Sequence, residues 1–342
     1  MELAAKYGFS RIFTCLLSAS SDPEVIKREF GAFLKKAHEL GYEVAADTNP
    51  QVFQNLGASP DNLEIFHQLG LDIIRLDGHF DELQDVLITR NPYGIKIEFN
   101  GSSDADVERL IRHGADRRNM IICHNFYPER YSGLSQKTFD RFNEKWTSLG
   151  MTTAAFVSSQ AEHTFGPWEV YQGLPTLEAD RTLPIDAQVR HMVACEVIDD
   201  ILIGNAYATE EELKAMASVK LTNTTIKMDE AEGLGEAEKD AVYRFIHNGR
   251  NDASEYFIRS SFPRLQFKSR EIPFRPCEKK TFTRGDVLVV NDNLAHYRGE
   301  VEIVLTEIEN DGQRNLAGRI ADTDMRILDE MEKRPDHVFE II

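Results

Sequence analysis

Polar side chains close a series of short apolar runs in this sequence. They are Asp47, Asp77, Glu98, Asn100, His124, Asn125, Ser158 and Asn205. If the runs are strands of one sheet, these side chains meet at one end of it. Because burying unpaired charge costs roughly several kcal/mol, such a cluster predicts an active site better than a stabilising core. Taken singly, each side chain could instead cap the next helix or pair with an arginine.

Two loops add further candidates. The segment CHNFYPERYSGLS, from Cys123 to Ser135, brings His124 and Asn125 together with Tyr127, Arg130 and Tyr131. Aromatic faces suit a sugar ring, and arginine can grip a phosphate or carboxylate with two parallel hydrogen bonds. An ordinary surface loop punctuated by a proline is the alternative.

The second loop, EHTFGPWEVYQGLPTLEADR, is longer than a plain strand-to-helix link of about 2–6 residues, and long loops are commonly functional. Glu178 and Arg181 lie three residues apart, just before a helix begun by Pro184, so they could share a face. The alternative is an exposed ion pair that contributes little to stability.

These residues are positioned by a repeat in which a helix ends in glycine and a short apolar run follows. The repeat appears as KYGFSRIFTCL from Lys6, ELGYEVAADTN from Glu39, QLGLDIIRLDG from Gln68, NPYGIKIEFNG from Asn91, RRNMIICHNF from Arg117, SLGMTTAAFVSS from Ser148 and VIDDILIGNA from Val197. Nearly continuous, β-branched runs are typical of parallel strands covered on both faces. Residues 1–218 are therefore predicted to form an α/β barrel of the TIM type, with its site at the carboxyl ends of the strands. An open doubly wound sheet is the alternative.

The chain starts with MELAAKYG, which resembles the tail of a helix with no strand before it. A closed eight-stranded barrel would therefore lack its first strand in this sequence. Two explanations are open: the true start lies upstream, or the barrel is open between its first and last strands.

Residues 219–342 follow a different pattern. TFTRGDVLVV, GEVEIVLTEIE and HVFEII, separated by turn signals, predict antiparallel strands and hence a smaller, mostly β domain. Its densest polar segment, HNGRNDASEYFIRSS, contains Arg250 and Arg259. We expect either a basic edge laid over the barrel mouth or a solvated loop.

Composition excludes several classes of function. The 39 Lys and Arg against 57 Asp and Glu give a formal charge of -18, which disfavours nucleic acid and anionic membranes as partners. The four cysteines have no metal-ligand spacing, so we expect reduced thiols and no metal. Without GxGxxG, GxxxxGK[ST], HExxH or GxSxG, no cofactor is predicted. No apolar run is long enough for a membrane span and no signal peptide is visible, so we expect a soluble cytoplasmic protein.

Four long runs, NPYGIKIEFNGS, CHNFYPERYSGLS, TFGPWEVYQGLPTLEADR and DDILIGNAYATEEELKA, resemble the bacterial 6-phospho-N-acetylmuramidases. The resemblance extends over essentially the whole chain. It implies a TIM barrel of the (β/α)8 type joined to a cyclophilin-like β domain. It also implies cytoplasmic hydrolysis of 6-phospho-N-acetylmuramyl-N-acetylglucosamine, a product of cell-wall recycling, to N-acetylmuramic acid (MurNAc) 6-phosphate and N-acetylglucosamine (GlcNAc). Members of the family usually begin with a strand of the kind GISIYP, which is absent here.

Glycoside hydrolysis needs one protonated carboxyl group and a second group at the anomeric carbon. We expect Asp47 and Glu98 as the central pair, with Glu178 as the next choice for the acid. The predicted substrate-binding residues are Asp77, Asn100, His124, Asn125, Tyr127, Arg130, Arg181, Asn205 and Arg250. Among these, Arg130 and Arg181, with Arg250 or Arg259, are the candidates for the 6-phosphate and the lactyl carboxylate. Retention, inversion and attack by the substrate's own acetamido group stay open, as does a homo-oligomer.

Two other functions are compatible with the sequence. One is a different barrel enzyme acting on a phosphosugar, such as an epimerase or an aldolase. An aldolase needs a metal or a Schiff-base lysine, for which the predicted strands offer Lys96. The other is a sugar-binding protein without catalytic activity.

Overall fold

The computed structural model describes residues 1–17, 23–267 and 269–342. The chain divides into two compact units. The barrel unit comprises Met1–Gln188 and Val197–Ser218, and the C-terminal unit comprises Val189–Glu196 and Val219–Ile342.

The barrel unit is built on one parallel sheet. Its strands are β1 (Arg11–Cys15), β2 (Glu43–Thr48), β3 (Ile73–Leu76), β4 (Lys96–Asn100), β5 (Met120–Cys123), β6 (Thr153–Val157) and β7 (Asp200–Ile203), paired in that order. Each lies within one of the apolar runs that predict it. A doubly wound sheet reverses its strand order at a switch point, and this sheet does not. The predicted TIM-type α/β barrel is confirmed, as a nearly closed barrel of seven strands.

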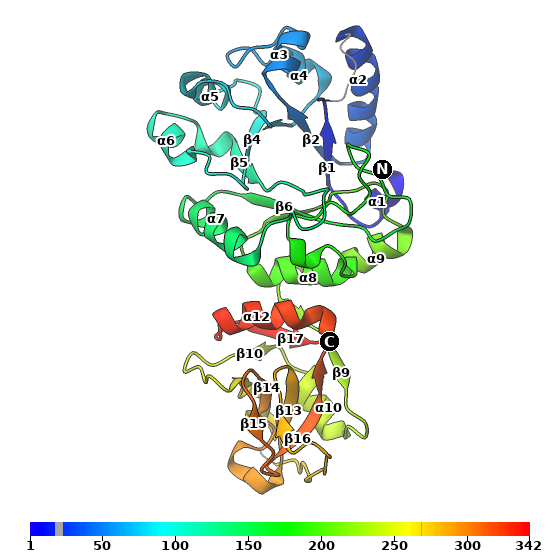
Figure 1. Ribbon diagram of the computed structural model, residues 1–342, viewed down its shortest axis with the longest axis vertical. Coiled ribbons are helices and arrows are strands. Elements are labelled where there is room, and N and C mark those ends of the chain that lie inside the picture. Colours follow the sequence, from blue (N-terminus) through cyan, green and yellow to red (C-terminus); the bar gives the residue numbers. More distant parts are fainter. Residues whose placement is uncertain (18–22, 268) are drawn as a thin grey trace. The chain divides into compact units, whose positions relative to one another are not determined.

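Helices surround these strands on the outside (Figure 1). They are α1 (Glu2–Lys6), α2 (Pro23–Glu39), α3 (Pro50–Leu56), α4 (Glu64–Leu69), α5 (Glu82–Ile88), α6 (Val107–Arg112), α7 (Gln136–Ser148), α8 (Ile185–Cys195) and α9 (Glu210–Ala217), with 3-10 turns at Arg117–Asn119 and Glu178–Asp180. Thr209 and Glu212 form a complete capping box at the start of α9. Helix α3 escaped the sequence analysis, although Asn49 caps it and Pro50 occupies its first turn.

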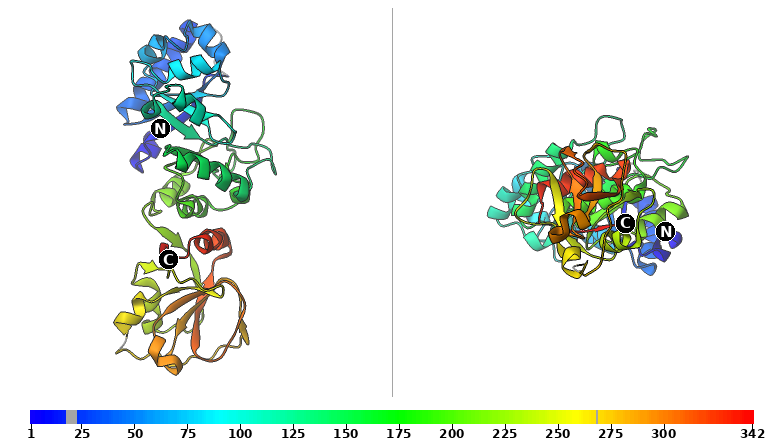
Figure 2. Two further views of the ribbon diagram at one scale, coloured as in Figure 1. Left: turned by 90° about the vertical axis from the view of Figure 1, so that its left-hand side faces the viewer. Right: turned by 90° about the horizontal axis from the view of Figure 1, so that it is seen from below.

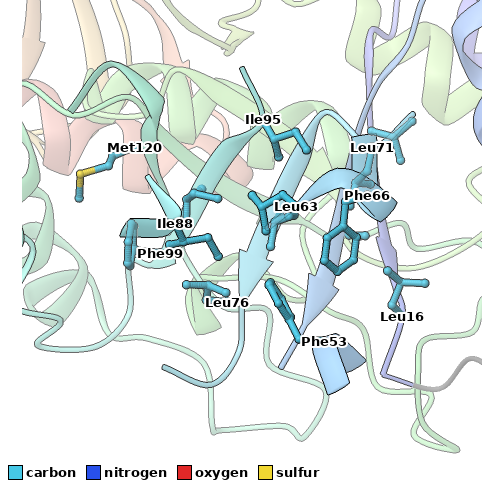
Figure 3. Packing of buried hydrophobic residues seen from close by; sticks show 14 of the residues in the cluster. Leu16, Phe53, Leu63, Phe66, Leu71, Leu76, Ile88, Ile95, Phe99 and Met120 are labelled. Carbon is cyan, nitrogen blue, oxygen red and sulfur yellow. The ribbon is translucent and has the colours of Figure 1, made fainter. Parts of the chain in front are cut away.

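The main core of this unit lies between the sheet and the helices (Figure 3). The rings of Phe53 and Phe66 pack with centroids 4.9 Å apart, and both side chains are buried. Trp146 of α7 is also fully buried, and its indole nitrogen donates to the carbonyl of Gly101 at 3.0 Å. The helices are thereby fixed against the strands that carry the polar side chains.

Apolar side chains fill the interior of the barrel below its mouth. Phe13 of β1 packs against Ala45, Ile73 and Ile121 on one side and against a cluster around Phe156 on the other. The interior is thus a packed core and not a channel, as in other barrels of this size. Charged side chains lie in the layer above this core and in one ion network formed by Arg11, Glu98 and Asp200.

That network joins the first and last strands. Arg11 of β1 donates to Asp200 of β7 at 2.6 Å and to Glu98 of β4. The Arg11 side chain is 9% exposed and that of Glu98 is 0% exposed. In the described chain no hydrogen-bonded ladder connects β1 with β7, so this ion network is a direct link across the seam.

Replacing Arg11 with Met should lower the free energy of unfolding of the barrel unit by about 3–5 kcal/mol, because Glu98 would be left as a buried charge without this partner. Urea unfolding followed by tryptophan fluorescence measures the change, since both tryptophans lie in the barrel unit. The double variant with E98Q should recover part of the loss. A loss no larger than that of K6M, which removes an exposed ion pair with Glu210, would contradict the role of this network.

The C-terminal unit is mostly β structure, as predicted. Its strands are β8 (Thr224–Ile226), β9 (Met228–Glu230), β10 (His247–Asn248), β11 (Phe257–Ser260), β12 (Thr281–Phe282), β13 (Asp286–Val290), β14 (Val301–Val304), β15 (Ile308–Glu309), β16 (Arg314–Ile320) and β17 (Val338–Ile341). The helices are α10 (Glu236–Tyr243), α11 (Phe262–Phe267) and α12 (Met325–Lys333), with 3-10 turns at Asp292–Tyr297 and Asp322–Asp324. The largest sheet has the order β11-β14-β13-β16-β9, and its central strands are coloured orange in Figure 2.

One buried ion pair anchors helix α8 in this unit. Arg190 donates to both carboxylate oxygens of Asp324, at 3.0 and 2.7 Å, and neither side chain is more than 2% exposed. Arginine and carboxylate match in a bidentate geometry that is stronger than a single hydrogen bond.

Candidate active site

Three charged side chains lie side by side on neighbouring strands of the barrel. Asp47 of β2 is in register with Arg75 of β3, and Arg75 is in register with Glu98 of β4. In-register neighbours on parallel strands present their side chains to the same face. The two carboxyl groups that the sequence predicts as a pair are therefore brought together, with an arginine between them.

Arg75 is the centre of this cluster and was missed by the sequence analysis. Its guanidinium donates to Asp47 at 2.7 Å and to the side-chain oxygen of Asn125. It also lies 3.6 Å from Asp77 and 3.8 Å from Glu98. Arg75 is itself buried. The sequence does contain an indication of this role, a single arginine inside the apolar run IIRL. A charged side chain in a buried strand is stable only when other groups pair with it.

Asp47 has the electrostatic character of a proton donor. Burial raises the pKa of this carboxyl group above its ordinary value, although Arg75 acts in the opposite direction. The neighbouring charges of Asp77 and Glu98 raise the pKa of Asp47 further. A carboxyl group that holds its proton to higher pH than usual is suited to general acid catalysis.

Asp77 is the exposed member of the cluster. Its side chain is 50% exposed and follows the end of β3. Since one nitrogen of Arg75 lies 2.7 Å from Asp47 and 3.6 Å from Asp77, these two carboxylate oxygens are no further apart than the sum of those distances. Two carboxyl groups of different exposure thus share one cation at the barrel mouth.

Glu98, predicted as the partner of Asp47, is the most deeply buried acid of the cluster. Its side chain has no exposed surface and is held by Arg11 from below and Arg75 from the side. A catalytic carboxyl group must touch the substrate, so Glu98 is better explained as the residue that positions the two arginines. The apolar run around Glu98 indicated its strand but not its depth in the barrel.

The residues that follow β4 and β5 hold each other in place. Asn100 accepts from the backbone of Ser102 at 2.9 Å. The hydroxyl of Ser102 in turn contacts His124 at 3.2 Å and accepts from the backbone of Asn125 at 2.9 Å. His124 is fully buried, and burial lowers its pKa to about 4. His124 is therefore a neutral structural residue at physiological pH, whereas the sequence analysis assigned it to substrate binding.

Tyr127 and Arg130 continue the same loop toward solvent. Tyr127 is half-buried, and burial raises the pKa of its hydroxyl. Arg130 is exposed, and among the described residues no carboxylate pairs with its guanidinium. Its backbone nitrogen donates to Gln172 of the following long loop at 3.0 Å. Arg130 thus keeps a cation available at the mouth of the barrel.

Glu178 and Arg181 form a clamp between two loops. Arg181 donates to both oxygens of Glu178, at 2.8 and 2.6 Å, and to the carbonyls of Tyr127 and Glu129. Glu178 also accepts from the backbone of Gly133 at 2.9 Å, where an added Cβ would lie only 2.6 Å from its oxygen. The predicted proximity of Glu178 and Arg181 is real, but it is not an exposed pair, since Arg181 is 4% exposed.

The clamp does not fit the catalytic and phosphate-binding roles predicted for it. The hydrogen bonds from Arg181 and from the backbone hold the pKa of Glu178 down to about 2, so it stays ionised at neutral pH and is a poor acid. The donors of Arg181 are occupied by Glu178 and by backbone carbonyls. Both residues are therefore interpreted as structural residues that hold the two loops together at the barrel mouth.

Asn205 and Arg250, also predicted to bind substrate, both have partners within the protein. Asn205 is buried, accepts from the backbone of Ser159 at 2.8 Å and donates to the carbonyl of the same residue at 3.0 Å. It therefore fixes the end of β6. Arg250 lies in the C-terminal unit and forms a two-pronged pair with Asp252 at 2.6 and 2.7 Å.

The comparisons with known proteins now bear on this site. The family model for the 6-phospho-N-acetylmuramidase N-terminal region matches residues 1–218, and the one for the C-terminal region matches residues 224–341. The chain belongs to the 6-phospho-N-acetylmuramidase family. It is thus a glycosidase, and its substrate is a small sugar molecule.

Two solved structures are similar to this family member. The crystal structure of an uncharacterized B. cereus protein is 38% identical, with a TM-score of 0.89, and the match covers 99% of this chain and 93% of that one. A conserved Enterococcus faecalis protein of unknown function is 23% identical, with a TM-score of 0.68, over 100% of this chain and 90% of that one. The latter supports the fold alone. No curated protein matches the chain.

The rival chemistries find less support in the geometry. Lys96, the candidate for a Schiff base, lies at the amino end of β4 and pairs with Glu43 at 3.5 Å, so it is at the wrong end of the barrel. Within the described residues, one group has ligand atoms close enough for a metal: His191, Cys195 and Glu330, within 4.8 Å of one another. It lies in the C-terminal unit, and Glu330 already pairs with Lys333.

No described helix of this glycosidase combines the length and the apolar character that a membrane span needs.

Acidification should destabilise the barrel unit through His124. The ordinary pKa of 6.5 falls to about 4 in the folded protein, so between these values the unfolded chain binds a proton that the folded protein does not. Stability should therefore fall as the pH is lowered from about 6.5 toward 4. Urea unfolding across this range, read by tryptophan fluorescence, measures the slope. An H124N variant should show a smaller slope, and an unchanged slope would contradict this account of His124.

Proposed function

We propose that this protein hydrolyses the glycosidic bond of 6-phospho-N-acetylmuramyl-N-acetylglucosamine, releasing MurNAc 6-phosphate and GlcNAc. The observation that carries the proposal is the pairing of Asp47 and Asp77 on Arg75 at the carboxyl ends of the strands. Membership of the family supports the choice of substrate. The four free cysteines are compatible with a reducing compartment such as the cytoplasm, where a recycled cell-wall disaccharide would be processed.

Asp47 is assigned as the general acid. The substrate's glycosidic oxygen takes the proton of Asp47 while its bond to the anomeric carbon breaks, so that GlcNAc leaves as a neutral alcohol. In the second half of the reaction a water molecule gives its hydroxyl to the anomeric carbon and its proton to Asp47, while the bond between that carbon and the oxygen that attacked it in the first half breaks. Water is thus added across one bond, and the enzyme returns to its starting state.

Asp77 is assigned as the second carboxylate. Because both carboxylates contact the same nitrogen of Arg75, the two groups are close enough to act on one sugar ring. Asp77 would either attack the anomeric carbon itself or orient the substrate's acetamido oxygen to attack it.

Arg75 and Glu98 position the two aspartates. Arg75 holds both aspartates, and Glu98 fixes Arg75 and Arg11 from within the barrel. With these contacts the acid and the second carboxylate are placed before the substrate arrives, which removes reorganisation from the reaction barrier.

The D47N variant should lose activity by about 10²–10⁴-fold, the usual contribution of a general acid. Release of GlcNAc from the phosphorylated disaccharide measures the rate, and circular dichroism verifies the fold. D77N should show a comparable loss, because the anomeric carbon would lack its second group. D104N serves as the matched control, since Asp104 follows β4 but is exposed and pairs with Arg141. Near-normal turnover by both D47N and D77N would overturn the assignment.

Arg130 is proposed to bind the 6-phosphate, because it is exposed at the mouth and no described carboxylate neutralises it. R130A should raise KM for the phosphorylated disaccharide by about ten- to a hundredfold, as expected for a lost charge-assisted hydrogen bond. KM for the unphosphorylated disaccharide should change little.

The matched control is R118A, because Arg118 is equally exposed but lies before β5 and pairs with Asp116. Equal effects of R130A on the two substrates would remove Arg130 from phosphate recognition.

A further inference from the structure

Large aromatic side chains gather, exposed, on the loops that follow β6 and β7. Phe165 is 48% exposed, Trp168 is 56% exposed and Tyr207 is 77% exposed. Single exposed apolar residues are common on protein surfaces, but a group of aromatic rings on neighbouring loops marks a binding surface. The mechanism above uses none of these three residues.

The loops that carry these rings are firmly held. Phe165 and Ala206 exchange two backbone hydrogen bonds, at 2.6 and 2.9 Å, and the rings of Phe165 and Tyr207 meet edge to face with centroids 5.5 Å apart. A Cβ at Gly204 would lie 2.3 Å from the carbonyl oxygen of Leu174, so the long loop lies directly on the end of β7. Rings fixed in this way lose little conformational entropy when a ligand binds.

Ring contacts connect this surface to the charged cluster. Trp168 packs against Phe126 with centroids 5.9 Å apart, and Phe126 packs against Phe13 at 6.1 Å. The guanidinium of Arg75 lies 5.8 Å from the centre of the Phe13 ring. The aromatic surface and the Asp47–Asp77 pair therefore belong to the same mouth: the surface lies on the loops after β6 and β7, and the pair lies at the ends of β2 and β3.

Charge indicates which part of a substrate this surface can accept. Glu162 and Glu169 lie in the same loop as Trp168, and both are exposed. The negative charge of this loop would repel a phosphate or a lactyl carboxylate. An uncharged sugar avoids this repulsion, and its C–H face can cover an aromatic ring while its hydroxyl groups stay in water.

We propose that Phe165, Trp168 and Tyr207 form the subsite for the uncharged leaving sugar, an N-acetylhexosamine, which stacks on Trp168. This inference rests on the proposed function, since it assigns the second half of the same disaccharide. It separates the two sugars by charge: the anionic sugar lies over the charged cluster and Arg130 of the loop after β5, and the neutral sugar lies over the rings of the loops after β6 and β7.

The W168A variant tests the subsite through two substrates that differ only in the leaving group. For the phosphorylated disaccharide, kcat/KM should fall by about tenfold or more, as expected when a large aromatic contact is lost. For 6-phospho-N-acetylmuramyl fluoride, whose leaving group is a single atom, kcat/KM should stay within about twofold of the wild type. L83A is the matched control, because Leu83 is equally exposed but lies on α5.

Binding can be measured without any turnover. Trp168 is exposed whereas Trp146 is fully buried, so quenching by acrylamide reports on Trp168. Millimolar GlcNAc should protect the wild-type fluorescence from quenching, and GlcNAc 6-phosphate should protect it less. The W168F variant should show no such response.

The two measurements separate the two proposals. Protection by GlcNAc without hydrolysis of the disaccharide would refute the proposed function and leave the sugar subsite standing. Hydrolysis of the disaccharide at an undiminished rate by W168A, with no protection by GlcNAc, would overturn the subsite and leave the function standing. Equal losses of W168A on the disaccharide and the fluoride would also overturn it, since Trp168 would then act on the reacting sugar.

Discussion

The mouth of this barrel depends on one buried guanidinium. Arg75 sits among Asp47, Asp77 and Glu98, and without it three acidic groups would face one another in a poorly solvated space. Like charges at such short range cannot all stay ionised. The arginine allows an acidic cluster to exist there, and burial raises the pKa of Asp47 even beside this cation. The packed apolar interior below, centred on Phe13, excludes water that could otherwise solvate these acidic groups in place of Arg75.

The sequence predicted the architecture well because strands and helices follow from local pattern. All seven apolar runs form strands. Consecutive βα units usually lie side by side, which favours the observed strand order over the open sheet that the pattern also allowed. The short helix α3 was missed because it fits within a segment that also resembles a loop.

Side-chain roles were harder to predict because depth and partners are tertiary properties. Asp47 and Glu98 both close apolar runs, yet one keeps a little exposed surface and the other keeps none. Glu178 and Arg181 show the right spacing for an ion pair, but the backbone groups that saturate them come from a loop more than forty residues earlier. Arg75 was overlooked because most of the residues that pair with it lie on other strands and loops, far from it in sequence. Periodicity records which face a residue occupies and says nothing of what it meets there.

The clamp of Glu178 and Arg181 also bears on how this mouth can change in evolution. One carboxylate and one guanidinium connect the segment after β5 to the segment after β6. The two segments are therefore structurally coupled and are expected to evolve together. A substitution in either segment alters the fit of the other, so their sequences are expected to vary in step. New specificities would then arise by exchanging both segments together.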